Sequence, residues 1–162
     1  MKKALALILV VLLFAVPVFA AEGIVWTCKN VFSGGSTWTE ISAVITTAAD
    51  GSVTATQFGG TSGGSGTCYD VRGKYLYQIR SYYGGTAVTA DSDLVLYPDN
   101  NTAQDILNAA GTNMVDDNTN KSFKPMINGV EAPVPVFGIP YLDILNNIVD
   151  SATHAIWFEF IQ

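Results

Sequence analysis

The chain has 162 residues, of which 49% are hydrophobic, and its formal net charge is −6 at pH 7. This length allows one domain with a substantial core, and the apolar content argues against a disordered chain. An acidic protein repels phosphate backbones and anionic lipids, so nucleic acid and membrane surfaces are poor candidates as partners.

The first 20 residues have the pattern of a secretory signal peptide. Lys2-Lys3 gives a basic start, residues 4–16 contain no polar side chain, and Val18-Phe19-Ala20 fits a small-residue cleavage site. The apolar run is too short to span a bilayer comfortably. We therefore expect residues 21–162 to form a single secreted or periplasmic domain with no membrane contact after cleavage. Loss of two lysines leaves 6 basic and 14 acidic residues, a net charge of −8.

Cys28 and Cys68 are the only two cysteines. Export permits a disulfide, and two cysteines allow one intramolecular pairing. The alternatives are a reactive thiol or a metal thiolate, but there is no CxxC spacing and only one histidine. We expect a structural disulfide. Its effect on the entropy of the unfolded chain should stabilise the folded protein by about 3.5–4 kcal/mol.

The remaining sequence predicts short strands separated by turns. Runs rich in β-formers or with period-two alternation cover residues 24–32, 37–47, 52–58, 73–83, 93–97, 139–145 and 153–161. Asp50-Gly51 supplies the positive φ values of a tight hairpin, which predicts that the second and third strands pair. The composition of residues 59–66 predicts a flexible Gly/Ser loop, and this stretch lacks the Gly-Lys-Ser/Thr ending of a phosphate-binding loop.

One short helix is predicted over residues 102–111. Thr102 and Asp105 resemble a capping box, and Gly111 is a suitable C-terminal cap. The apolar side chains Ile106, Leu107 and Ala110 would face the core.

The last third of the chain returns to strands and turns. Asn128-Gly129 predicts a turn, and Pro133 and Pro135 mark an extended segment that cannot be a central strand. The final run, 153–161, is apolar on both faces apart from Glu159, so it requires burial between layers or against a partner chain. This pattern predicts an all-β fold, an antiparallel β-sandwich of about seven to eight strands with one short helix; a closed barrel is the alternative.

The order of motifs from Gly73 onward resembles that of small β-rich proteins found among phage particle genes. The matching stretches are Gly-Lys-Tyr-Leu-Tyr-Gln-Ile-Arg at 73–80, Thr-Ala-Asp-Ser-Asp-Leu-Val-Leu at 89–96, Thr-Ala-Gln-Asp-Ile-Leu-Asn-Ala-Ala-Gly at 102–111 and the apolar last strand. The resemblance, over residues 73–162, implies a virion-associated, decoration-like component that binds protein subunits and is not an enzyme. The chain differs in its signal peptide and in having Asn108 or Ala109 where those proteins have glycine.

The sequence shows no catalytic apparatus. His154 is the only histidine and lies in the apolar last strand. The sequence contains no Gly-x-Ser-x-Gly motif that would place a nucleophilic serine for it. We therefore expect a solvated or hydrogen-bonded histidine and no catalytic triad. A carboxylate pair of the glycosidase type is neither supported nor excluded, because 14 acidic residues produce some pairs by chance.

No cofactor is expected, with calcium as a minor alternative. Zinc lacks a usual ligand set, whereas clustered side-chain oxygens suit calcium. The two candidate clusters are Asp91, Asp93 and Asp99, and Asp116 and Asp117 with Asn118 and Asn120.

Aromatic side chains are the remaining functional candidates. Trp26 and Trp38 lie in apolar strands and are expected in the core, whereas Tyr82 and Tyr83 precede Gly84-Gly85 and are candidates to face a ligand. We expect a non-enzymatic structural or adhesive protein that binds protein subunits or a cell-surface polymer, or self-assembles as a homo-oligomer. The alternatives are a carbohydrate-binding module and a small extracellular hydrolase.

Overall fold

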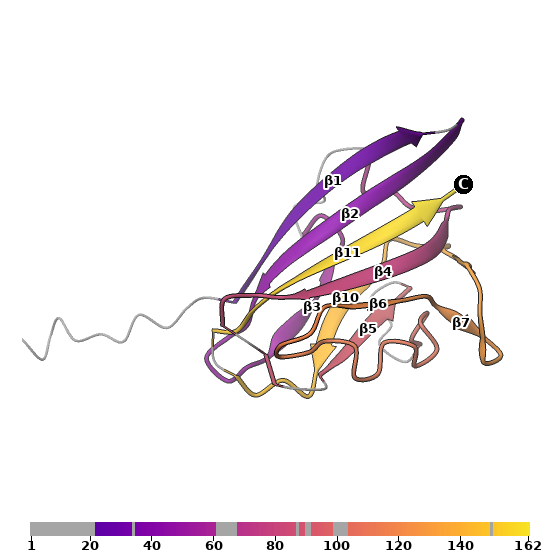
Figure 1. The fold of residues 1–162 in the computed structure, drawn as a ribbon. Coiled ribbons are helices and arrows are strands. Elements are labelled where there is room, and N and C mark those ends of the chain that lie inside the picture. The colour runs from indigo at the N-terminus through magenta and orange to yellow at the C-terminus, as the bar shows by residue number, and fades with distance from the viewer. Residues whose placement is uncertain are drawn as a thin grey trace, which may run out of the picture.

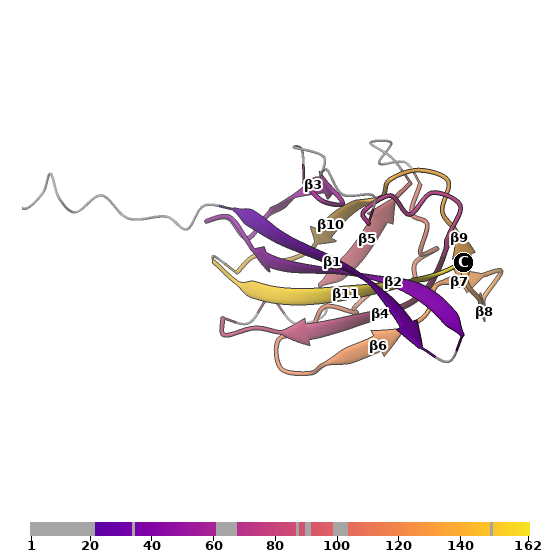
Figure 2. The same cartoon turned by 90° about the horizontal axis from the view of Figure 1, so that it is seen from above.

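The computed structural model describes residues 22–33, 35–60, 68–86, 88–89, 92–98, 104–149 and 151–162. The predicted signal peptide lies outside these residues. The structure is all-β, and its strands form two main antiparallel sheets arranged as layers (Figures 1 and 2).

The larger sheet, sheet A, follows the order β1-β2-β11-β4-β6, with β9 pairing the start of β4. Its strands are β1 (Gly23–Ser33), β2 (Ser36–Thr46), β11 (Thr153–Ile161), β4 (Tyr75–Tyr83), β6 (Lys121–Phe123) and β9 (Val134–Pro135). Sheet B has the order β3-β10-β5, formed by β3 (Val53–Gln57), β10 (Tyr141–Leu145) and β5 (Asp93–Tyr97). A small hairpin pairs β7 (Met126–Ile127) with β8 (Val130–Glu131).

The core lies between the two sheets. Alternate side chains of β2 and β11 are buried, because successive residues of a strand point to opposite faces. They pack in one cluster with the inward side chains of sheet B, and the cluster includes Ile41, Ile45, Ile156, Phe158, Phe160, Leu94, Leu96, Leu142 and Ile144. The Phe58 ring lies 4.8 Å from that of Phe158. This packing makes the fold a β-sandwich, as the sequence predicted.

All seven predicted strands are present, and four short strands, β6 to β9, were not predicted. The last strand is central, between β2 and β4, so its two apolar faces are explained by its position in the sheet. Asn128-Gly129 forms the β7–β8 turn with positive φ at both residues. Pro135 lies in a two-residue strand at the edge of sheet A, as expected for a proline.

The hairpin predicted at Asp50-Gly51 is wrong. β2 already pairs β1 and β11, so the chain turns at Gly51 and enters sheet B, where β3 pairs β10. Gly51 has φ +80°, and a Cβ there would lie 2.6 Å from the backbone of Ile148. The Asp-Gly pair therefore makes a tight turn between layers instead of a turn between neighbouring strands.

The predicted helix is also wrong. The described part, residues 104–111, is a series of turns, because Asn108 and Ala109 have φ of 50° and 64°, which a right-handed helix cannot accommodate. The Asp105 carboxylate accepts hydrogen bonds from the backbone N–H groups of Leu107 and Ala109, both 3.0 Å, and so holds these turns. Gly111 is not a helix cap: it approaches Leu94 O so closely that a Cβ would lie 1.9 Å away. Thr102 lies outside the described residues.

The predicted disulfide is confirmed. Cys28 and Cys68 are bonded with a Cα–Cα distance of 6.1 Å, which joins the edge strand β1 to the segment before β4. Such a bond is compatible with an extracellular or periplasmic protein. Among the described residues, no helix is long and apolar enough to cross a membrane.

Removing the disulfide should reduce stability without changing the fold. The Cys28→Ser, Cys68→Ser double variant loses a cross-link over a sequence separation of 40, which predicts a loss of about 3.5–4 kcal/mol in the free energy of unfolding. Urea unfolding of both proteins measures it. An unchanged midpoint would show that the bond does not constrain the unfolded chain.

Truncation of Phe158 should be among the most destabilising single changes. The side chain is fully buried in the centre of sheet A and contacts the Phe58 ring, so Phe158→Ala should cost about 3–5 kcal/mol. Phe137→Ala is the matched control, since Phe137 is 83% exposed, and should cost no more than about 0.5 kcal/mol. Similar thermal midpoints for the two variants would contradict the assigned core.

Candidate functional site

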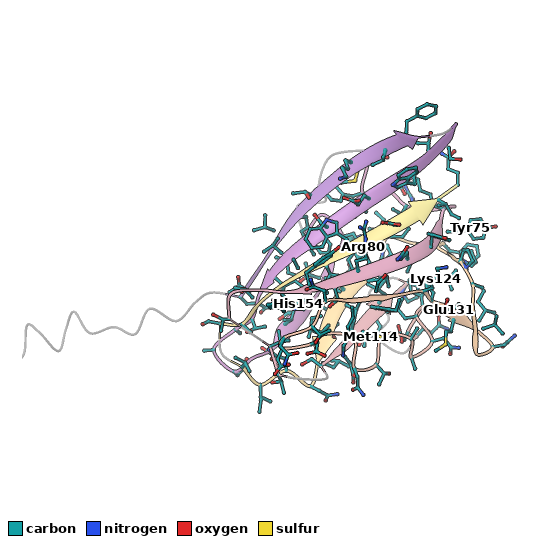
Figure 3. The ribbon with its side chains drawn as sticks, viewed as in Figure 1. Tyr75, Arg80, Met114, Lys124, Glu131 and His154 are labelled. Carbon is teal, nitrogen blue, oxygen red and sulfur yellow. A yellow bond between two sulfur atoms is a disulfide. The ribbon has the colours of Figure 1, made fainter. Side chains whose placement is uncertain are left out.

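The two faces of sheet A differ in what they contact. The inner face packs on sheet B, and the opposite face carries the outward side chains of β1, β2, β11 and β4, here called the outer face. Its members are Val25, Thr27, Lys29, Val31, Trp38, Glu40, Ser42, Val44, Tyr75, Gln78, Arg80, Tyr82, Ala155, Trp157, Glu159 and Ile161. They are half-buried or exposed. Figure 3 shows Tyr75 at one end of β4 and Arg80 farther along it.

The centre of the outer face is a charged network. Lys29 Nζ lies 2.7 Å from Glu40 Oε1, and Arg80 Nη2 lies 3.5 Å from Glu40 Oε2. Arg80 also pairs with Glu159, which the strand register places beside Glu40. Two cations and two carboxylates make this centre electrically neutral. Arg80 Nε is buried and has no hydrogen-bond partner within the described ranges, so the two carboxylates do not saturate the guanidinium.

One end of the outer face is aromatic and aliphatic. The Tyr82 and Trp157 rings meet edge to face, with centroids 4.6 Å apart and an interplanar angle of 72°. Val25 and Val44 continue the row of Tyr82 across the sheet and are 67% and 48% exposed. This end therefore presents apolar surface to solvent.

The other end carries a second aromatic row. Trp38 pairs with Ile161, and Ile161 pairs with Tyr75, so the three side chains cross β2, β11 and β4 in one line. Tyr75 is 44% exposed. A cleft of about 380 Å³ adjoins this row and is lined by Gly35, Ser36, Thr37, Trp38, Ile161 and Gln162.

The four aromatic residues named as candidates in the sequence analysis lie in different environments. Trp26 packs against the core, 5.1 Å from the Phe58 ring, as expected. The core assignment of Trp38 is wrong, because Trp38 shares its face with Glu40 and points away from the buried Thr39. Tyr82 lies on the outer face, and Tyr83, at the end of β4, is 50% exposed.

Trp157, Arg80, Glu159, Glu40 and Lys29 are members of the outer face that sequence reasoning did not single out. The signal was present in the last strand: Trp157 lies two residues from Glu159, so both share the face that a charged residue marks as outward. The contacts across β1, β2 and β4 needed the strand order, which the sequence did not provide.

His154 forms a buried pair with a serine. His154 Nε2 lies 2.7 Å from Ser81 Oγ on the inner face, and the two residues are 2% and 0% exposed. Burial lowers the pKa of His154 from 6.5 to about 4, opposed by the negative charge of Asp116, so the ring is neutral at pH 7. Among the residues that the structure describes, Nδ1 has no hydrogen-bond partner and no carboxylate orients the ring. The pair fits the expected hydrogen-bonded strand histidine and is closed to substrate in this structure.

Carboxylates do not converge in either described cleft. A second cleft of about 340 Å³ borders Trp26, Thr54 and Glu22, whose carboxylate accepts hydrogen bonds from the backbone N–H and hydroxyl of Thr54. Of the described lining residues, Glu22 is the single acidic one in this cleft, and those of the cleft beside Trp38 include no Asp or Glu. Burial raises the pKa of Asp143, which accepts a hydrogen bond from the Tyr97 hydroxyl at 3.4 Å on sheet B. Nothing in these contacts provides the acid and nucleophile of a glycosidase.

The calcium candidates are engaged by protein groups where they are described. Asp93 accepts hydrogen bonds from Asn113 N and Asn146 Nδ2, and Asp116 pairs with Lys121 at 2.7 Å. Asp91 and Asp99 lie outside the described residues. Within the described ranges, no group of three or more His, Cys, Asp or Glu residues could hold a metal ion.

The comparisons with known proteins identify no relative. The chain matches no protein-family model, no curated protein and no solved structure. The described residues form an antiparallel, disulfide-bonded β-sandwich, and one face of its larger sheet carries partly exposed aromatic side chains.

The buried His154 should make stability depend on pH. Its folded pKa, about 4, lies below the ordinary 6.5, so the unfolded chain binds the proton more readily. The stabilisation is complete above pH 6.5 and is lost as the pH falls toward 4. Urea unfolding should show a loss of about 2 kcal/mol from about pH 7.5 to about pH 5.

His154→Gln is the control for this effect, because an amide can hydrogen-bond Ser81 but does not titrate. The variant should lose most of the dependence on pH over the same interval. Equal dependence in both proteins would assign the effect to another group.

Proposed function

We propose that the chain is an exported, non-enzymatic binding protein that contacts another macromolecule through the outer face of sheet A. The observation that carries the proposal is the composition of this face. Trp157, Tyr82, Trp38 and Tyr75 lie on the side of a sheet that antiparallel sandwiches usually give to polar residues. Tyr75, Val25 and Val44 on this face are exposed, and the other three rings are partly exposed. Exposed apolar surface of this kind marks interaction sites in soluble proteins.

Export is supported by the pattern of the first 20 residues together with the disulfide between Cys28 and Cys68. A non-enzymatic role is supported by the buried state of Ser81 and His154. Glu40 and Glu159 lie side by side on the outer face, but both are ion-paired with Arg80. A structural or adhesive role also agrees with the resemblance to phage-particle proteins. The partner is a protein subunit, including a second copy of the chain, or a polymer of the cell surface.

A photo-crosslinker on the outer face tests the proposal, because it captures whichever macromolecule occupies this face in the cell. p-Benzoylphenylalanine replaces Ser42, which lies between Thr27 and Trp157 in the strand register. Irradiation of producing cells should give a covalent adduct of higher mass. The same residue in place of Phe137, which is 83% exposed but outside this face, should give little adduct.

Trp157→Ala in the Ser42 crosslinker background should reduce the adduct at least tenfold, because an aromatic hot spot is worth about 2 kcal/mol or more. A thermal melt verifies that the variant is folded. Failure to form an adduct at position 42, or equal adducts at 42 and 137, would overturn the proposed function.

A further inference from the structure

The outer face has a polar centre between two aromatic ends. Along β2, Trp38 lies four residues from Ser42, which pairs with Trp157, so the two tryptophans are separated by roughly 14 Å along the strand. Glu40 and Glu159 lie between them and pair with Arg80, which is level with Trp157 on the neighbouring strand. This length exceeds one sugar ring and suits an extended chain of several units.

The arrangement is the reverse of a protein–protein interface. Such interfaces deplete charged residues at the centre and place them at the rim. A protein partner covering Glu40, Arg80 and Glu159 would remove an ion network from water, at a cost that the ion pairs do not reliably offset. A narrow, hydrated ligand leaves water around the network and avoids this penalty.

The charge balance indicates an uncharged ligand. The two cations and two carboxylates at the centre cancel, and the whole chain is acidic. An anionic polymer would be repelled by the carboxylates of Glu40 and Glu159. Hydroxyl groups, by contrast, can donate hydrogen bonds to carboxylates and accept charge-assisted hydrogen bonds from Lys29 and Arg80. Tryptophan and tyrosine rings at both ends provide flat apolar surfaces for the C–H faces of sugar rings.

We infer that the outer face of sheet A binds a neutral polysaccharide chain, with rings against Trp157 and Trp38 and hydroxyls on Glu40, Glu159 and Arg80. This inference rests on the proposed function, since it names the ligand of the same face. The cleft beside Trp38 and Ile161 would receive one end of the polysaccharide.

Affinity electrophoresis tests the ligand class directly. Gels contain one soluble neutral polysaccharide each, hydroxyethyl cellulose, glycol chitin at a pH where it is uncharged, laminarin, galactomannan or dextran, with alginate as the anionic comparison. We expect at least one neutral polymer to retard the protein, and high salt not to weaken the effect, because no net charge is neutralised. Alginate should not retard it.

Substitutions on the outer face test whether this face is the site that binds the polysaccharide. Trp157→Ala and Trp38→Ala should each weaken it about tenfold, since one ring stacked on a ligand is worth about 1–3 kcal/mol in comparable aromatic platforms. Trp26→Phe is the matched control, because Trp26 packs on the inner side, and should bind as the original chain does. Equal binding by Trp157→Ala, or no retardation by any neutral polymer, would overturn the inference.

The two proposals can fail separately. An adduct at position 42 whose tryptic digest contains a peptide of another protein, or of a second copy of this chain, crosslinked to residue 42 would show a protein occupant: the proposed function would stand and the polysaccharide inference would fall. The absence of any adduct at position 42 would remove both.

Discussion

The period-two alternation of the central strand β11 is the constraint on which the rest of the structure depends. Ile156, Phe158 and Phe160 point inward and join the core, while Trp157 and Glu159 point outward. A shift of the register by one residue would exchange the two sets. The same nine residues therefore define both the interior of the sandwich and the middle of the candidate binding face.

The outer face depends on strand order as much as on composition. Lys29, Glu40, Glu159 and Arg80 come from four strands distributed over most of the sequence, and they meet because β11 inserts between β2 and β4. The pairing holds two carboxylates side by side, and Arg80 shares its charge between them. A sheet assembled in another order would retain the residues and lose the network.

Local sequence patterns predict what depends on local physics. The seven main strands follow from alternation and β-formers, and the turn at Asn128 follows from its tolerance of positive φ. The Asp50-Gly51 pair does form a turn, but it does not join paired strands, because a turn does not specify which strands pair. The helix prediction fails at Asn108 and Ala109, whose backbone is set by the close packing of Gly111 on β5 and by the Asp105 carboxylate.

The candidate site is less accessible to sequence reasoning than the fold. The place of Tyr82 before a glycine pair identifies it as a candidate, but its contact with Trp157 requires the β4–β11 register. The apolar strand around Trp38 predicts a core position, whereas the burial of Thr39 fixes the opposite orientation. The period-two alternation of Ile41, Ala43 and Ile45 does predict the buried face of this strand, and Thr39 shares that face. The core assignment of Trp38 fails because it followed the apolar character of the segment instead of this alternation.

The position of β11 also has a consequence for the order of folding. Sheet A cannot close until residues 153–161 are available, because β2 and β4 are joined through this strand. Pairings between segments so distant in sequence form slowly, since the intervening chain must first be ordered. A nascent chain that lacks residues 153–161 therefore cannot complete its larger layer, so the outer face is assembled only after this strand has been synthesised.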